Sequence, residues 1–199
     1  MKAGGAQAIA PREFELIVIA ASAGGLPALR TLLGTLPADF PLPIAIVLHL
    51  DPNHISLGAE ILDRRTKLCV KQGVDGDVLR AGVVYLATPD AHLVIGPGGI
   101  VRLARTPRVH FLRPAADRLF ETAAAVCGRV IAVVLTGSGT DGAAGVTAVK
   151  AAGGVVIAQD KGTSDFFGMP QAAIGTGAVD FILPLDEIGR TLVDLTETK

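Results

Sequence analysis

Residues 16–27 read Leu-Ile-Val-Ile-Ala-Ala-Ser-Ala-Gly-Gly-Leu-Pro, and this stretch decides the fold of the chain. Its first six residues are a continuous apolar run rich in isoleucine, which predicts a buried β-strand. Ser22 and three small residues follow, and Pro27 opens an apolar-periodic stretch that reaches Leu36. Because proline is favoured in the first turn of a helix, the stretch predicts a strand, a turn and a helix in that order.

The same alternation recurs along the chain. Further buried strands are predicted at 43–48, 130–135, 154–158 and 179–183. Helices are predicted from a cap at Asn53 or Ser56 to Arg65, and over 114–127, 143–152 and 185–195.

Residues 68–104 differ, because short β-like segments there alternate with Gly- and Pro-containing turns, which predicts hairpins or an antiparallel extension of the sheet. The pattern as a whole indicates an α/β fold, with a doubly wound, mostly parallel sheet flanked by helices and an antiparallel β-hairpin extension. We expect residues 1–15 to be an N-terminal tail and 16–197 to be one domain.

Composition excludes several classes of function. The 199 residues carry 18 basic and 19 acidic side chains, a net charge of −1, so no global basic field indicates nucleic acid as a partner. Polar residues or turns interrupt every apolar run, so no membrane insertion is expected. Two cysteines without a Cys-x-x-Cys pair argue against a disulfide scaffold or structural zinc and fit a reducing cytoplasm.

One local concentration of positive charge stands out against this balance. Its members are Arg102, Arg105, Arg108, Arg113 and Arg118. Such a run is most often a solvated rim, and the alternative is a surface that docks an acidic partner.

Three predicted strand ends carry side chains that can take part in catalysis: Ser22, His49 and Asp141. Sites in open α/β sheets form beyond the carboxyl ends of strands. A serine hydroxyl needs a base within hydrogen-bond reach, and the base needs an acceptor that fixes its tautomer. These residue types supply all three roles, and the turn at Ser22 is similar to the G-x-S-x-G elbow, with Ala20 at the first glycine.

Each residue also has an alternative explanation. Ser22 could merely cap the following helix. His49 could be a polar strand end, or a metal ligand with Asp51 and His54, although that spacing is not typical of zinc. Four other aspartates compete with Asp141 for the third role: Asp51, Asp90, Asp160 and Asp165.

A rival motif overlaps the third strand end. Gly137, Gly139 and Gly142 fit G-x-G-x-x-G between a strand and a helix, and Asp160 follows the next strand. That context is typical of a dinucleotide-binding turn, which would make the protein an NAD-binding oxidoreductase. The motif leaves the Ser22 turn and His49 unexplained.

Four motifs resemble those of a known family. They are the run 19–30 with Leu36-Pro37 and Val47-Leu-His-Leu50, the run 134–145, Ala158-Gln-Asp160 with Phe167-Gly-Met-Pro170, and Arg113-Pro114 before Leu119-Phe120. Together, in this order over about residues 15–195, they resemble the catalytic domain of the chemotaxis protein-glutamate methylesterase, CheB.

The resemblance implies a role for each matching position. Ser22 corresponds to the nucleophile, His49 to the base and Asp141 to the residue that orients the base. Backbone N–H groups of His49 and Ser138 correspond to the oxyanion hole. We also expect Gly24, Gly25, Arg113 and Met169 at the substrate.

The implied activity is hydrolysis of glutamate methyl esters on the cytoplasmic helices of methyl-accepting chemoreceptors, together with deamidation of receptor glutamine, without a metal or organic cofactor. A receptor methyltransferase or a separate response regulator is an implied partner, because residues 1–15 are too few for a receiver domain. The Ser-Ala-Gly-Gly-Leu and His-Leu-Asp-Pro-Asn-His forms look like the divergent branch fused to methyltransferases. A non-catalytic binding module of the same fold is the alternative.

Overall fold

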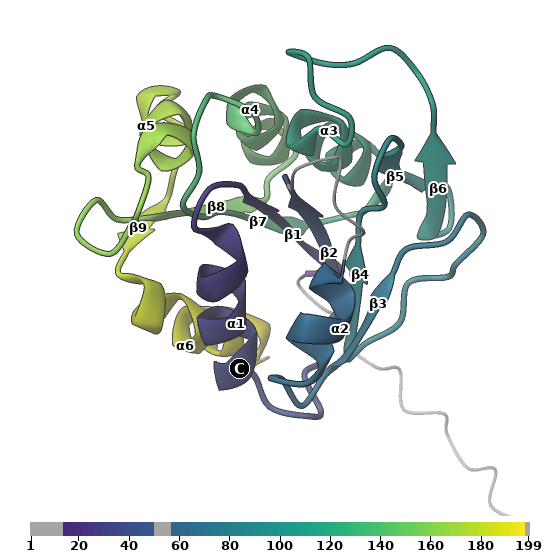
Figure 1. The fold of residues 1–199 in the computed structure, drawn as a ribbon, viewed down its shortest axis with the longest axis horizontal. Helices are drawn as coiled ribbons and strands as arrows, with labels where there is room; N and C mark the ends of the chain where they lie inside the picture. The colour runs from purple at the N-terminus through teal and green to yellow at the C-terminus, as the bar shows by residue number, and fades with distance from the viewer. Residues whose placement is uncertain (1–13, 50–56, 198–199) are drawn as a thin grey trace, which may run out of the picture.

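The computed structural model describes residues 14–49 and 57–197, which form a sheet with helices on both of its faces (Figure 1). Seven strands form the main sheet in the order β3-β4-β2-β1-β7-β8-β9, and every neighbouring pair is parallel. Their bounds are β1 Leu16–Ala21, β2 Ile44–Leu48, β3 Cys69–Gln72, β4 Val83–Leu86, β7 Val130–Val134, β8 Val155–Gln159 and β9 Phe181–Leu183. The predicted fold class is confirmed.

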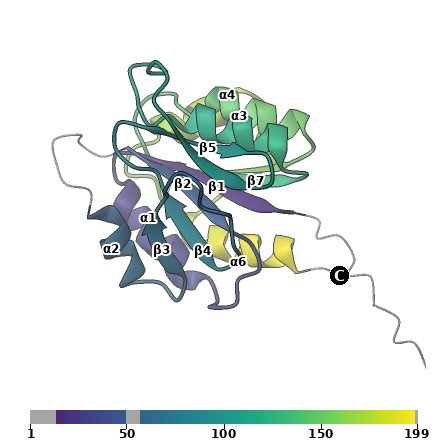
Figure 2. The ribbon, with the colours of Figure 1, turned by 90° about the vertical axis from the view of Figure 1, so that its right-hand side faces the viewer.

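Two layers of helices cover the sheet (Figures 1 and 2). On one face lie α1 Gly25–Thr35, α2 Gly58–Asp63 and α6 Leu185–Thr196. On the other lie α3 Ala116–Val126, α4 Ala143–Ala151 and α5 Gly168–Gly175, beside the hairpin of β5 His92–Gly96 and β6 Ile100–Ala104. Alternate residues of β1 point into the two layers, so Ile17 and Ile19 pack toward α1, and Leu16 and Val18 toward α3.

Residues 68–104 were predicted only in part. The antiparallel hairpin exists as β5 and β6, in a two-stranded sheet of its own. The prediction was wrong for β3 and β4, which pair in parallel inside the main sheet. Residues 73–82 return the chain to the start of β4, where Val84 and Leu86 become fully buried beside β2.

Smaller differences concern the helices. α5 was not predicted, because its eight residues show little separation of apolar from polar positions. α1 begins at Gly25, which places Pro27 in its first turn as expected. The predicted caps at Asn53 and Ser56 lie outside the described residues, and Leu57 is the N-cap of α2.

Candidate active site

Ser22 and His49 each follow directly on a central strand. β1 and β2 are parallel neighbours, and their last paired residues are Ala21 and Leu48. The next residue of each strand is therefore Ser22 or His49, so the two lie side by side at the carboxyl edge of the sheet. The Ser22 N–H donates to the Thr136 carbonyl at 3.0 Å, which ties this turn to the loop after β7.

The turn at Ser22 is tight, and small residues permit it. The Gly25 N–H donates to the Ser22 carbonyl at 2.7 Å, and Gly24 has φ +73°, a conformation that favours glycine. A Cβ on Gly25 would stand 2.8 Å from side-chain atoms of both Ala21 and Leu48. Both glycines are thus required by the turn itself, and their contact with substrate stays a prediction.

His49 meets Asp141 across the sheet edge. Their atoms Nε2 and Oδ2 are 3.0 Å apart, and the side chains are 11% and 1% exposed. The contact has the length of an ion pair but lacks the alignment of a hydrogen bond, since the buried Nε2 has no aligned partner among the described residues. Of the four candidate aspartates that the structure describes, Asp141 is the one that lies against His49.

Asp141 is held from a second direction by helix α3. Its Oδ2 accepts the Ala116 N–H at 2.6 Å, and its Oδ1 accepts the Asp117 N–H at 3.0 Å. Burial raises the pKa of Asp141, but the contact with His49 and these two N–H groups outweigh it, so the pKa lies below the usual value. The carboxylate that contacts His49 is therefore ionised at neutral pH.

Asp117 completes a reciprocal arrangement that the sequence analysis missed. Its Oδ1 accepts the N–H groups of Gly142 and Gly145, at the start of α4, at 2.9 and 2.8 Å. Each aspartate thus supplies acceptors for the first turn of the other's helix. Burial, with the charge of Asp141 added to it, raises the pKa of Asp117. An acidic residue in the first turn of a predicted helix was the available signal.

The predicted oxyanion hole needs a correction. The His49 N–H donates to the Ala21 carbonyl at 3.0 Å as part of the pairing between β1 and β2, so it is not free for a substrate oxygen. Ser138 is exposed at the tip of its loop, and its N–H has no acceptor among the described residues. This second predicted donor fits the geometry, and its role stays a prediction.

Met169 and Arg113, both predicted to contact the substrate, have different surroundings in the structure. Met169 is 1% exposed, and its side chain packs against Gly137 in the Gly-rich loop. A Cβ on Gly137 would lie 2.4 Å from the Met169 Sδ and 2.8 Å from the Ser22 Cβ. Arg113 binds Asp90 through Nη2 at 2.6 Å and the Thr106 carbonyl through Nη1 at 3.0 Å. The substrate role of both residues stays a prediction.

The metal and dinucleotide hypotheses gain little from the structure. Asp51 and His54 lie outside the described residues, within which no group of three His, Cys, Asp or Glu side chains could hold a metal ion. Asp160 uses its Oδ1 within its own turn, where it accepts from the N–H and the hydroxyl of Thr163.

Among the residues that the structure describes, no helix is long and apolar enough to cross a bilayer.

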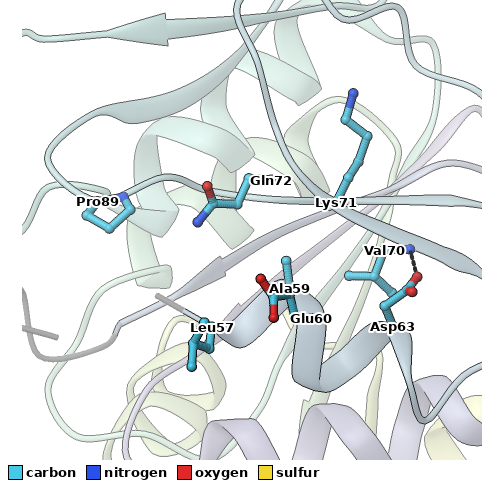
Figure 3. A pocket seen from close by; sticks show the side chains of 8 residues that line it. All are labelled: Leu57, Ala59, Glu60, Asp63, Val70, Lys71, Gln72 and Pro89. Carbon is cyan, nitrogen blue, oxygen red and sulfur yellow. Dashed lines mark hydrogen bonds between the residues drawn. The ribbon is translucent and has the colours of Figure 1, made fainter. Parts of the chain in front are cut away.

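A cavity of about 490 Å³ lies between α2 and the edge strand β3 (Figure 3). Asp63 accepts the Val70 N–H there at 2.9 Å and so occupies part of the sheet edge. The predicted site residues do not line it; the lining residues are Leu57, Ala59, Glu60, Asp63, Val70, Lys71, Gln72 and Pro89.

Comparisons with known proteins identify a family for this chain. A family model described as CheB methylesterase matches residues 17–192. The crystal structure of the Thermotoga maritima CheB methylesterase catalytic domain superposes with a TM-score of 0.88 at 38% identity, covering 92% of this chain and 99% of that one.

Relatives of known sequence carry consistent names. A protein-glutamate methylesterase/protein-glutamine glutaminase 2 of Anaeromyxobacter dehalogenans is 46% identical over 92% of this chain, and one from Pyrococcus horikoshii is 41% identical over 91%. The chain spans about half the length of these two relatives, 53% and 50%. A putative protein of the same name from Leptospira interrogans is 37% identical, and 96% of its length is covered.

Proposed function

The chain belongs to the CheB methylesterase family, and from this premise we propose that it hydrolyses methyl esters of protein glutamate side chains with a Ser22–His49–Asp141 triad. One observation carries the proposal: His49 lies 3.0 Å from the buried carboxylate of Asp141 and directly beside Ser22 in the strand register. Nucleophilic ester hydrolysis requires a base that a carboxylate orients and that reaches a hydroxyl, and the contact with Asp141 and the register with Ser22 support these roles.

The proton path follows from which nitrogen faces Asp141. Because Nε2 lies toward the carboxylate, Nδ1 is the nitrogen that accepts the Ser22 proton. As the proton leaves, Ser22 Oγ attacks the ester carbonyl and forms a tetrahedral intermediate. The imidazolium returns the proton to the departing methanol oxygen, and an acyl-enzyme remains. Water then attacks with the same base, which releases glutamate and restores the Ser22 hydroxyl.

The negative oxygen of the intermediate needs donors at the same edge. The Ser138 N–H is one candidate, and the N-terminal end of α1, which begins three residues after Ser22, adds its partial positive charge. Since the His49 N–H is bonded to Ala21, we assign it no part in this stabilisation.

The substrate is proposed from the names of the relatives. These names couple methylesterase with glutaminase activity, and the same triad serves both, since an amide replaces the ester and ammonia replaces methanol. We propose the cytoplasmic helices of methyl-accepting chemoreceptors as substrates and the cytoplasm as the location. A receptor methyltransferase or a response regulator is the proposed regulatory partner.

Methanol release from a methylated receptor fragment tests the proposal. Ser22→Ala is expected to lower kcat by about 10⁴-fold or more, as loss of a triad nucleophile commonly does. Ser164→Ala is the matched control, because its hydroxyl bonds only the Asp160 carbonyl among the described residues; its rate should stay within about twofold of wild type. A wild-type rate in Ser22→Ala would end the proposal.

Covalent labelling separates the enzyme from a binding module of the same fold. A fluorophosphonate probe should modify wild type at Ser22 and leave Ser22→Ala unmodified, because only an activated serine hydroxyl attacks it. An unlabelled wild-type protein that still binds the receptor fragment would favour the non-catalytic alternative.

A further inference from the structure

The loop between β6 and α3 presents an exposed aromatic side chain on a strained turn. Phe111 is 92% exposed, and Figure 1 shows this loop outside the layer of α3 and α4. Val109 and Leu112 exchange two backbone hydrogen bonds, which makes His110 and Phe111 the two central residues of a tight turn. Both have positive φ, +47° and +66°, a combination that usually selects Asn and Gly. A large apolar residue is thus held in water where glycine would fit better.

The base of this loop is firmly anchored. Nε2 of His92, a fully buried residue, lies 3.1 Å from the Pro107 carbonyl, and its Nδ1 accepts the Ala115 N–H at 3.1 Å. Arg113 adds bonds to Asp90 and to the Thr106 carbonyl. These bonds hold both ends of the loop in place, so less conformational entropy is lost when a partner binds the turn at its tip.

The five arginines of the basic run separate into two groups in the structure. Arg102, Arg113 and Arg118 each pair with an acidic side chain. Arg105 and Arg108 are exposed and have no ion pair among the described residues. Their charges nevertheless reach Asp90, whose pKa is lowered first by the hydrogen bond from Arg113 and also by these two arginines. Three arginines thus face one aspartate, which leaves an excess of positive charge around the turn.

The turn also lies close to the candidate active site. Ala116 is the fourth residue after Leu112, so their Cα atoms are at most about 14 Å apart. The Ala116 N–H contacts Asp141 directly. A protein segment that enters the site can therefore contact the turn at the same time.

We infer that Arg105, Arg108 and Phe111 form a docking surface for a carboxylate-rich segment of the protein substrate that flanks the scissile ester. The unpaired arginines complement its carboxylates, and the exposed ring packs on an apolar side chain between them. The inference rests on the proposed function, because it assigns this surface to the substrate of that reaction. It predicts that docking and chemistry are separable.

Steady-state kinetics on two substrates test this separation. Arg105→Glu/Arg108→Glu reverses the charge, and Phe111→Gly removes the ring while keeping a residue that suits the turn. Both variants should raise KM for a methylated receptor fragment about tenfold and leave kcat/KM for 4-nitrophenyl acetate within about twofold. Arg190→Glu, on α6 across the sheet, is a charge-reversal control and should behave as wild type.

A binding measurement keeps the test independent of catalysis. Wild type should bind a fluorescent peptide of glutamate, leucine and alanine more tightly than its glutamine-substituted counterpart, and 0.5 M salt should remove the difference. Arg105→Glu/Arg108→Glu should lose the preference, whereas Phe111→Gly should keep it and bind both peptides more weakly. Unchanged KM and peptide binding in both variants would overturn the inference, as would an equal loss on 4-nitrophenyl acetate. Failure of the proposed function shows separately, as full activity in Ser22→Ala.

Discussion

At the scale of single residues, Asp141 joins the proposed catalysis to folding. One carboxylate oxygen lies 3.0 Å from His49 Nε2 and accepts the Ala116 N–H, while the other accepts the Asp117 N–H. A carboxylate fixed by two backbone donors cannot rotate freely, so the start of α3 fixes the position of the carboxylate that His49 contacts. The side chain that we propose as the orienting carboxylate thus also caps a helix.

Asp141→Asn should therefore damage activity and stability together. In asparagine an NH₂ group takes the place of one carboxylate oxygen, so His49 loses its charged partner. One N–H group at the start of α3 also loses its acceptor. We expect kcat/KM for the methylated fragment to fall about 10⁴-fold, and the free energy of unfolding to fall by about 1–3 kcal/mol at pH 7. Asp194→Asn, an exposed carboxylate on α6, is the control and should change neither quantity.

The stability loss should depend on pH in a defined direction. The pKa of Asp141 is lowered below 3.8 by folding, so its contribution is complete above that value and disappears as the pH falls through the lower folded pKa. In urea titrations, the difference between wild type and Asp141→Asn should shrink as the pH falls below 3.8. A difference that keeps growing below this pH would contradict the assignment.

At the scale of elements, α3 and α4 are joined by their first turns. Asp117 in α3 accepts the N–H groups of Gly142 and Gly145 at the start of α4, and Asp141 before α4 accepts two of α3. Gly145 lets the helices approach closely, since a Cβ there would lie 2.5 Å from the Phe120 Cβ. The pair behaves as one unit that carries Asp141.

Two substitutions at Asp117 separate its roles as acceptor and charge. Asp117→Ala should lower the free energy of unfolding by about 1–3 kcal/mol, because two buried N–H groups lose their acceptor. Asp117→Asn keeps an oxygen there and removes a charge that burial and Asp141 disfavour, so its loss should be smaller. Urea unfolding at pH 7 measures both. Equal losses would mean that the charge, and not the acceptor, stabilises the helix pair.

The sequence could predict elements whose signals are local. Two strands were predicted from the apolar runs before Ser22 and His49, and α1 from its proline. Because both residues follow predicted strands, the sequence also indicated that they meet at the carboxyl edge of the sheet. Pairing direction is not a local property, and for this reason β3 and β4 were mistaken for hairpin strands. The bond from His49 N–H to Ala21 and the reciprocal caps depend on neighbours that only the folded chain defines.

At the scale of the whole molecule, the sheet divides the support of the site between two layers. Ser22 leads into α1 on one face, whereas Asp141 is held by α3 on the other. The two clusters of buried side chains are likewise separate, with Leu32 in the α1 layer and Phe120 in the α3 layer. Stability is shared by both layers, but the geometry around Asp141 depends mainly on one.

Leu32→Ala and Phe120→Ala test this division. Both residues are fully buried, and each truncation should cost about 2–5 kcal/mol of unfolding free energy. Leu32 lies in the last turns of α1, away from Ser22, so kcat/KM at 15 °C should stay within about twofold of wild type. Phe120 packs against Gly142 and Gly145, so its loss should loosen the turn that holds Asp141 and lower kcat/KM at least about tenfold. Circular dichroism confirms that both variants are folded at the assay temperature; equal activity losses would show that the layers do not act separately.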